Sequence, residues 1–159
     1  MTPYLVGIAG GLASSGKRVW AASFAAFIMC NAYDQLRMSV AFPCLNVKVV
    51  GTHVGISIGE DGPSQMSVEE TALACSLPGF IVLTPADELS TKELIRQATA
   101  HVGPVFVRTG RVKAPIIYGP DQRTQVTEST RNVVFTVYAP AGIDEQLIMG
   151  HLQDMREYV

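Results

Sequence analysis

The stretch that most clearly indicates the fold of this chain is Gly51-Thr-His-Val-Gly-Ile-Ser-Ile-Gly-Glu-Asp-Gly-Pro-Ser-Gln-Met66. It joins a strand pattern to a helix pattern through a long loop. The apolar run 47–50 precedes it, and Ser67-Val-Glu-Glu70, a capping-box pattern, follows it. Its four glycines allow the backbone to approach a ligand closely. In open α/β sheets, ligands bind at loops that leave a strand's carboxyl end and enter a helix. The stretch therefore predicts a ligand-facing loop; a long surface loop without a site is the alternative.

Strand and helix patterns alternate along the rest of the chain. The predicted strands are 18–22, 46–51, 80–83, 104–107 and 133–138, and the predicted helices are 3–13, 24–41, 68–76, 90–101 and 144–158. This alternation of apolar strands with helices predicts an α/β fold, a three-layer parallel sheet of about five strands with helices on both faces. Residues 1–118 form this domain, and 119–159 have the pattern of a polar linker followed by a short β-α extension.

The composition is that of one globular domain. Of 159 residues, 48% are hydrophobic and 16% charged, with a net charge of −2, which suits a single domain with a sizeable core. There is no basic stripe for nucleic acid, no apolar run of the about 18 residues that span a membrane, and no basic region typical of a signal peptide. Three cysteines without metal-ligand spacing fit reduced thiols. We expect a cytoplasmic protein without a metal site.

Several ordered motifs resemble the pyrimidine-binding domain of transketolases. Gly59-Glu-Asp-Gly-Pro-Ser-Gln-Met66, after Thr52-His53, is similar to the transketolase signature. The resemblance continues through residues 7–13, 23–27, 33–37, 85–87, 103–111 and 116–118, about three quarters of the chain. It implies the fold predicted above and a part in two-carbon ketol transfer between sugar phosphates with thiamine diphosphate, in the pentose phosphate pathway. Residues 119–159 are too few for the third transketolase domain, so they are a fragment of it or a divergent tail.

Phe24 and Phe27 stand three residues apart in the predicted helix 24–41, so they share a face. From the residues alone, they are a flat apolar slot for a heteroaromatic ring or ordinary core packing. The resemblance implies that both contact the aminopyrimidine of thiamine diphosphate. Some relatives carry a third aromatic residue where this chain has Cys30, so Cys30 is the third expected cofactor contact.

The resemblance also implies a substrate site. It matches His53 to a histidine that contacts sugar hydroxyls or the donor's phosphate, and Asp61 to an aspartate that binds the hydroxyl at C2. Gln65 stands where bacterial and yeast relatives have a second histidine and mammalian ones have glutamine. Arg111 and Arg108 match the region that holds the substrate phosphate, a role suited to guanidinium geometry. Without the resemblance, these arginines would be surface charges and His53 a loop histidine with its bonds satisfied.

The sequence departs from the transketolase pattern in two places. In transketolases, the glutamate that activates the cofactor lies in an Ala-Glu-Gln-Asn-Met run before Val-Gly-Ile-Ala, and alignment on Val6-Gly-Ile-Ala9 places Thr2 at its position. The Gly-Asp-Gly metal motif of the diphosphate-binding domain is also missing. Any Mg²⁺ is therefore expected only through a partner domain.

Three functions follow as alternatives. The first is a transketolase part that is inactive alone and depends on a diphosphate-binding subunit; whether it counts as an enzyme by itself stays open. The second is a non-catalytic scaffold of the same fold. The third is a domain similar to deoxyxylulose-phosphate synthase, which Glu60 disfavours because that family usually has alanine there. In each case we expect self-association, as a homodimer or higher species, through the helices near the glycine-rich N-terminal segment.

Overall fold

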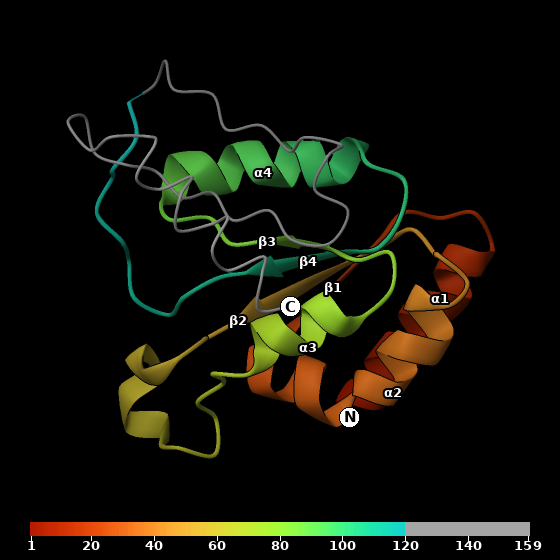
Figure 1. Cartoon of the computed structure of the whole chain (residues 1–159), viewed down its shortest axis with the longest axis horizontal. Helices are drawn as coiled ribbons and strands as arrows, with labels where there is room; N and C mark the ends of the chain where they lie inside the picture. Colours follow the sequence, from red (N-terminus) through yellow and green to blue (C-terminus); the bar gives the residue numbers. More distant parts are fainter. Residues whose placement is uncertain (120–159) are drawn as a thin grey trace, which may run out of the picture.

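Four parallel strands form the centre of the computed structural model, which describes residues 1–119. The strands are β1 (Val19–Phe24), β2 (Val47–Thr52), β3 (Ile81–Leu83) and β4 (Val105–Arg108). Their order in the sheet is β1-β2-β4-β3, and every neighbouring pair is parallel (Figure 1). The predicted parallel sheet is confirmed. The expected fifth strand, 133–138, and the expected helix, 144–158, lie outside the described residues.

Helices cover both faces of this sheet, as predicted (Figure 1). The helices are α1 (Thr2–Ser14), α2 (Tyr33–Leu36) between the π-helical segments η1 (Ala26–Asn31) and η2 (Arg37–Ala41), α3 (Glu70–Ser76) and α4 (Glu88–Ala100). Among the described residues, α4 is the helix on one face, and the other helices named here lie on the opposite face. Within residues 1–119, none of the helices has the length and apolar character needed to cross a membrane.

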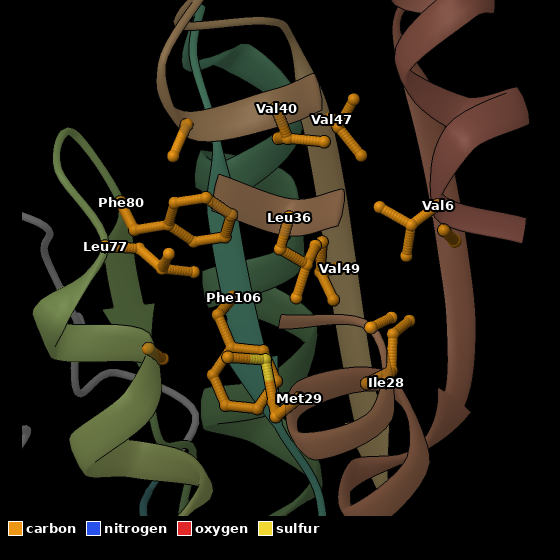
Figure 2. Close-up of a cluster of buried hydrophobic side chains, with 14 of the residues drawn as sticks. Val6, Ile28, Met29, Leu36, Val40, Val47, Val49, Leu77, Phe80 and Phe106 are labelled. Atoms are coloured by element: carbon orange, nitrogen blue, oxygen red, sulfur yellow. The ribbon is translucent and has the colours of Figure 1, made fainter. Parts of the chain in front are cut away.

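The two faces of the sheet have separate cores because side chains alternate along each strand. On β4, Phe106 packs into the larger core with α1, α2 and α3, whereas Val105 and Val107 pack against Leu94 of α4. Figure 2 shows the larger core, where α1, α2 and the segments beside them meet the strands β2 and β4. Its labelled side chains are Val6, Ile28, Met29, Leu36, Val40, Val47, Val49, Leu77, Phe80 and Phe106.

Two glycines allow elements of this core to approach closely. A Cβ on Gly10 of α1 would lie 2.7 Å from the carbonyl oxygen of Ser39, so the glycine-rich helix does pack tightly on a neighbour. A Cβ on Gly51 would lie 2.8 Å from the ring of Phe106, which brings the end of β2 down onto the core. α1 itself begins at Thr2, one residue earlier than predicted.

Both predicted capping boxes are wrong, because each serine makes a different local contact. The Ser67 hydroxyl donates to the Glu70 carboxylate (2.8 Å) instead of capping backbone, and α3 begins only at Glu70. Ser90 is the third residue of α4, not its cap. The cap is Asp87, which accepts the Ser90 backbone N–H at 2.8 Å.

Asp87 also ties the end of the described chain to α4. Its second carboxylate oxygen accepts the backbone N–H groups of Ile117 (2.8 Å) and Tyr118 (2.9 Å). Burial alone would raise the pKa of Asp87, but the backbone and hydroxyl bonds from Ser90, Tyr118 and Ile117 hold its pKa at about 2. Asp87 therefore anchors the end of the segment 109–119 to the start of α4.

Lys48 lies within the apolar strand β2 and is fully buried. Its ammonium donates to the Asn46 side chain (2.7 Å) and to the backbone carbonyls of His101 (3.0 Å) and Gly103. Burial, with a smaller effect of the positive charge of Arg18, lowers the pKa of Lys48 to about 8. These bonds join the start of β2 to the turn after α4, at the edge of the sheet opposite the candidate site.

Candidate cofactor and substrate site

The expected ligand-binding residues gather where β1, β2 and β4 end. In the sheet register, Phe24 at the end of β1 lies opposite Thr52 of β2, and Gly51 lies opposite Arg108 at the end of β4. The loop 51–66 leaves β2 between these two strands. The prediction that this loop lies at the carboxyl edge of the sheet is therefore confirmed.

Three aromatic rings form a cluster at this edge. Phe24 and Phe27 are nearly parallel, with an angle of 4° and ring centroids 5.7 Å apart, and the His53 ring stacks on Phe24 at 4.0 Å and 18°. Phe24 is the last residue of β1, because it still pairs with Thr52, so its predicted place in the first helical turn is wrong. Both phenylalanines are only half-buried, which leaves part of their surface accessible.

The two phenylalanine rings are too close for a third ring to lie between them. Stacked carbon atoms keep about 3.5–4.0 Å apart, so an inserted ring would need at least about 7 Å between the outer rings. A heteroaromatic ring would therefore stack on a face of the pair that His53 leaves open, and not between the two phenylalanine rings.

His53 has a backbone conformation that few non-glycine residues adopt, with φ of 56°. Its Nδ1 atom lies 2.9 Å from the hydroxyl oxygen of Thr52. The Thr52 hydroxyl in turn lies 3.3 Å from the carbonyl oxygen of Ser23. Backbone strain of this kind collects at functional sites, and here the Phe24 stack and the Thr52 contact both hold the imidazole in place.

Arg111 holds the signature loop. The 3-10 helix η3 (Ile56–Asp61) follows Gly55, whose N–H donates to the Ser67 carbonyl at 2.7 Å and closes the loop at its base. Arg111 donates to Glu60 (2.6 Å), to Asp61 (3.2 Å) and to the backbone carbonyl of Ile58. The structure thus joins Asp61 and Arg111, two of the expected substrate residues.

Arg108 belongs to a separate network. Its Nε atom donates to the Glu70 carboxylate at 2.6 Å, and the other Glu70 oxygen accepts the Ser67 hydroxyl. The Glu70 side chain is 1% exposed, whereas that of Arg108 is 35% exposed. Arg108 therefore compensates the buried charge of Glu70. Arg111 does not share this role.

Cys30 lies at the end of η1 and donates its thiol to Glu69 at 3.2 Å. Burial, followed by the bond to Glu69, raises the pKa of Cys30 to about 11. The backbone N–H of Val68, followed by the Cys30 thiol, lowers the pKa of Glu69. Cys30 is therefore a neutral thiol at neutral pH, which suits a ring contact and not a nucleophile.

Gln65 has a local hydrogen-bond partner. Its side chain accepts the Ser64 hydroxyl at 2.8 Å. Within residues 1–119, no hydrogen bond joins it to His53 or Asp61.

Residues 4–116 match the model of a protein family described as the transketolase, pyrimidine binding domain. The chain belongs to this family. It is 44% identical over 114 residues to a putative transketolase C-terminal section of Methanocaldococcus jannaschii, covering 72% of this chain and 36% of that protein. It is 39% identical over 126 residues to human transketolase, covering 79% of this chain and 20% of that enzyme. The chain thus spans about a third of the archaeal relative and a fifth of the human one.

The fold of a solved transketolase structure agrees with this membership. A split-gene transketolase, described as an inactive beta4 tetramer, superposes with a TM-score of 0.70 at 35% sequence identity. The match covers 79% of this chain and 40% of that one. The α/β fold and the transketolase resemblance are therefore both confirmed.

Transketolases use thiamine diphosphate, and the chain's residues fit one half of that cofactor. The rings of Phe24 and Phe27 are flat, apolar and partly exposed, as stacking on an aminopyrimidine requires, and His53 already covers part of Phe24. Within residues 1–119, no group of three or more His, Cys, Asp or Glu side chains is placed to hold a metal ion. The described residues therefore offer a surface that fits the ring of the cofactor.

Sequence reasoning missed the roles of Thr52 and Glu70. In the sequence, Thr52 stands out only as part of the motif with His53. A hydroxyl next to a histidine is a signal that the two side chains can form a hydrogen bond. Glu70 was assigned to a cap, although an acidic residue inside an apolar helix pattern also fits a buried ion pair. Arg108, its partner, lies 38 residues away, and sequence spacing gives no sign of that contact.

Proposed function

We propose that this chain is the part of a transketolase that binds the aminopyrimidine of thiamine diphosphate and the sugar substrate in two-carbon ketol transfer. The observation that supports the proposal is the meeting of the Phe24, Phe27 and His53 rings at the carboxyl edge of the sheet, where the signature loop begins. Bound there, the cofactor supplies the stabilised carbanion, and the protein orients the reactants.

The chain's own residues have distinct parts in this proposal. Phe24 and Phe27 stack on the ring, with Cys30 as a third contact. His53 and Asp61 bind sugar hydroxyls, and Gln65 lines the same loop. Arg111 binds the substrate phosphate after exchanging its exposed partner Glu60 for it, since the Glu60 side chain is 80% exposed.

Because Arg108 is tied to buried Glu70, we assign it a supporting part in phosphate binding. A cytoplasmic place in the pentose phosphate pathway follows from the proposed activity. Mg²⁺ enters only through a diphosphate-binding partner.

A polypeptide of these 159 residues is expected to show no ketol transfer from xylulose 5-phosphate to ribose 5-phosphate with thiamine diphosphate and Mg²⁺. The reason is that Thr2 replaces the activating acid and that the described residues offer no metal site. A coupled spectrophotometric assay measures this. Turnover that is lost in Asp61→Ala or His53→Ala would show that the site contains another acid.

The exposed face of α1 supports self-association. Tyr4 is 77% and Ile8 63% exposed, and Leu5 and Leu12 are also exposed, while no residue of this helix is charged. Helix α1 therefore has an apolar face that is exposed in addition to the apolar face that is buried. A similar chain is described as a beta4 tetramer, which supports a second copy, or a diphosphate-binding subunit, as the partner for this face.

Ile8→Lys is expected to weaken self-association at least about tenfold, because burying an isoleucine stabilises an interface by about 1.5–3 kcal/mol and lysine resists burial. Sedimentation velocity over a concentration series measures the change. Val102→Lys is the matched control, since Val102 is 78% exposed but lies after α4, on the other side of the sheet. A wild-type chain that stays monomeric, or equal effects of both variants, would contradict the proposal.

The alternative of a non-catalytic scaffold makes a different prediction for the same protein. A scaffold would self-associate through α1 but would not bind thiamine diphosphate with any partner subunit. Cofactor binding therefore separates the two functions.

A further inference from the structure

The contacts of Thr52 determine where the His53 ring carries its proton. The Thr52 hydroxyl oxygen has two neighbours, the Nδ1 atom of His53 at 2.9 Å and the carbonyl oxygen of Ser23 at 3.3 Å. A carbonyl oxygen can only accept a hydrogen bond, and a hydroxyl has one proton to donate. Both contacts are hydrogen bonds only if the hydroxyl donates to Ser23 and accepts from a protonated Nδ1 of His53.

The opposite arrangement makes one hydrogen bond fewer. If the Thr52 hydroxyl donated to Nδ1, its proton would be used and the contact with Ser23 would no longer be a hydrogen bond. The stacking of His53 on Phe24 at 4.0 Å, together with its strained backbone, keeps the ring in this orientation. The arrangement with two bonds is therefore the favoured one.

We infer that Thr52 is a positioning residue that fixes the neutral imidazole of His53 as the Nδ1–H tautomer and leaves Nε2 as a hydrogen-bond acceptor. Among the described residues, Nε2 of His53 has no hydrogen-bond partner. The atom is therefore available to a ligand at the carboxyl edge of the sheet.

This tautomer distinguishes between the two ligand groups that the family resemblance allows for His53. An acceptor nitrogen binds a hydroxyl, which has a proton to give. It cannot donate to a phosphate dianion unless the ring takes up a second proton. Resting on the proposed function, we therefore expect the neutral ring to accept a hydrogen bond from a ligand hydroxyl at Nε2, and we expect a phosphate dianion to require the doubly protonated ring.

The tautomer can be measured directly by long-range ¹H–¹⁵N correlation spectra of the full chain at about pH 9, where imidazole is neutral. His53→Gln removes the signals of this ring and so assigns them among the three histidines. In the wild-type chain we expect an Nδ1 shift typical of a protonated nitrogen and an Nε2 shift typical of an unprotonated one. A predominantly Nε2–H ring in the wild-type chain would overturn the inference by itself, even if no variant folded.

Thr52→Val keeps the shape of the side chain but removes the hydroxyl, and we expect it to shift His53 to a ring with the proton mainly on Nε2. Thr52→Ser should retain the Nδ1–H form. Thr109→Val is the matched control, because the Thr109 hydroxyl bonds the Gly51 carbonyl (3.3 Å) at the same edge without touching His53. An unchanged tautomer in folded Thr52→Val would contradict the inference. No substrate is present, so this result and that of the ketol-transfer assay can fail independently.

Discussion

Replacing Thr2 by glutamate is expected to raise ketol transfer by about 10²-fold or more when the chain is combined with a diphosphate-binding transketolase subunit, since a positioned proton donor typically contributes about 10²–10⁴-fold. The variant introduces a carboxylic acid at the position that the transketolase resemblance assigns to the activating glutamate. Thr2 is the first residue of α1, and carboxylates are favoured in the first turn of a helix. The substitution should therefore leave the fold intact.

Thr2→Gln is the control for this experiment. Glutamine has nearly the same shape and can still donate a hydrogen bond, but it has no acidic proton. A gain with glutamate and none with glutamine would identify acid–base help as the missing element. Equal rates for Thr2, Glu and Gln chains in a complex that binds the cofactor would show that Thr2 does not occupy the position of the activating acid.

The second large effect concerns stability. Arg108→Met is expected to lower the free energy of unfolding by about 3–5 kcal/mol, because it leaves the Glu70 charge buried without its partner. The Ser67 hydroxyl alone cannot compensate a carboxylate that is 1% exposed. Urea unfolding followed by circular dichroism measures the loss. Glu70→Gln should cost less, since Arg108 is 35% exposed and regains water.

Arg111→Met is a closely matched control, because the Arg111 side chain is also 35% exposed. Its carboxylate partners, Glu60 and Asp61, are 80% and 41% exposed, and exposed ion pairs contribute little to stability because water and salt screen them. We expect little loss of stability but weaker binding of sugar phosphates. If Arg108→Met and Arg111→Met lowered the free energy of unfolding equally, burial of Glu70 would not be the reason for the large effect expected at Arg108.

The layers of the fold could be predicted from sequence because they depend on local patterns. Continuous apolar runs such as 80–83 are typical of strands covered on both faces, and the glycine-rich loop 51–66 marks the edge where they end. Positions near the ends of elements were less predictable. Phe24 fits a strand or a helix equally well by its own properties, and its pairing with Thr52 decides for the strand.

The side-chain networks could not be predicted, because a spacing pattern does not decide which of several possible partners a side chain bonds. Ser67 and Ser90 are each followed three residues later by glutamate, yet one bonds a buried carboxylate and the other lies inside a helix capped by Asp87. Likewise, the signature aspartate Asp61 meets Arg111 only when the loop folds back. The sequence therefore predicts a set of site residues that lie near one another, but only the structure shows their hydrogen-bond and ion-pair partners.

Thiamine diphosphate binding to an equimolar mixture of this chain and a diphosphate-binding transketolase subunit, measured by calorimetry with Mg²⁺, tests the central claim most directly. We expect the mixture to bind the cofactor more tightly than the partner subunit does alone. We also expect Phe27→Ala to remove that gain, whereas Phe42→Ala, at a phenylalanine that is 78% exposed just after η2, should not. A mixture that assembles but binds the cofactor no better than the partner alone would contradict it.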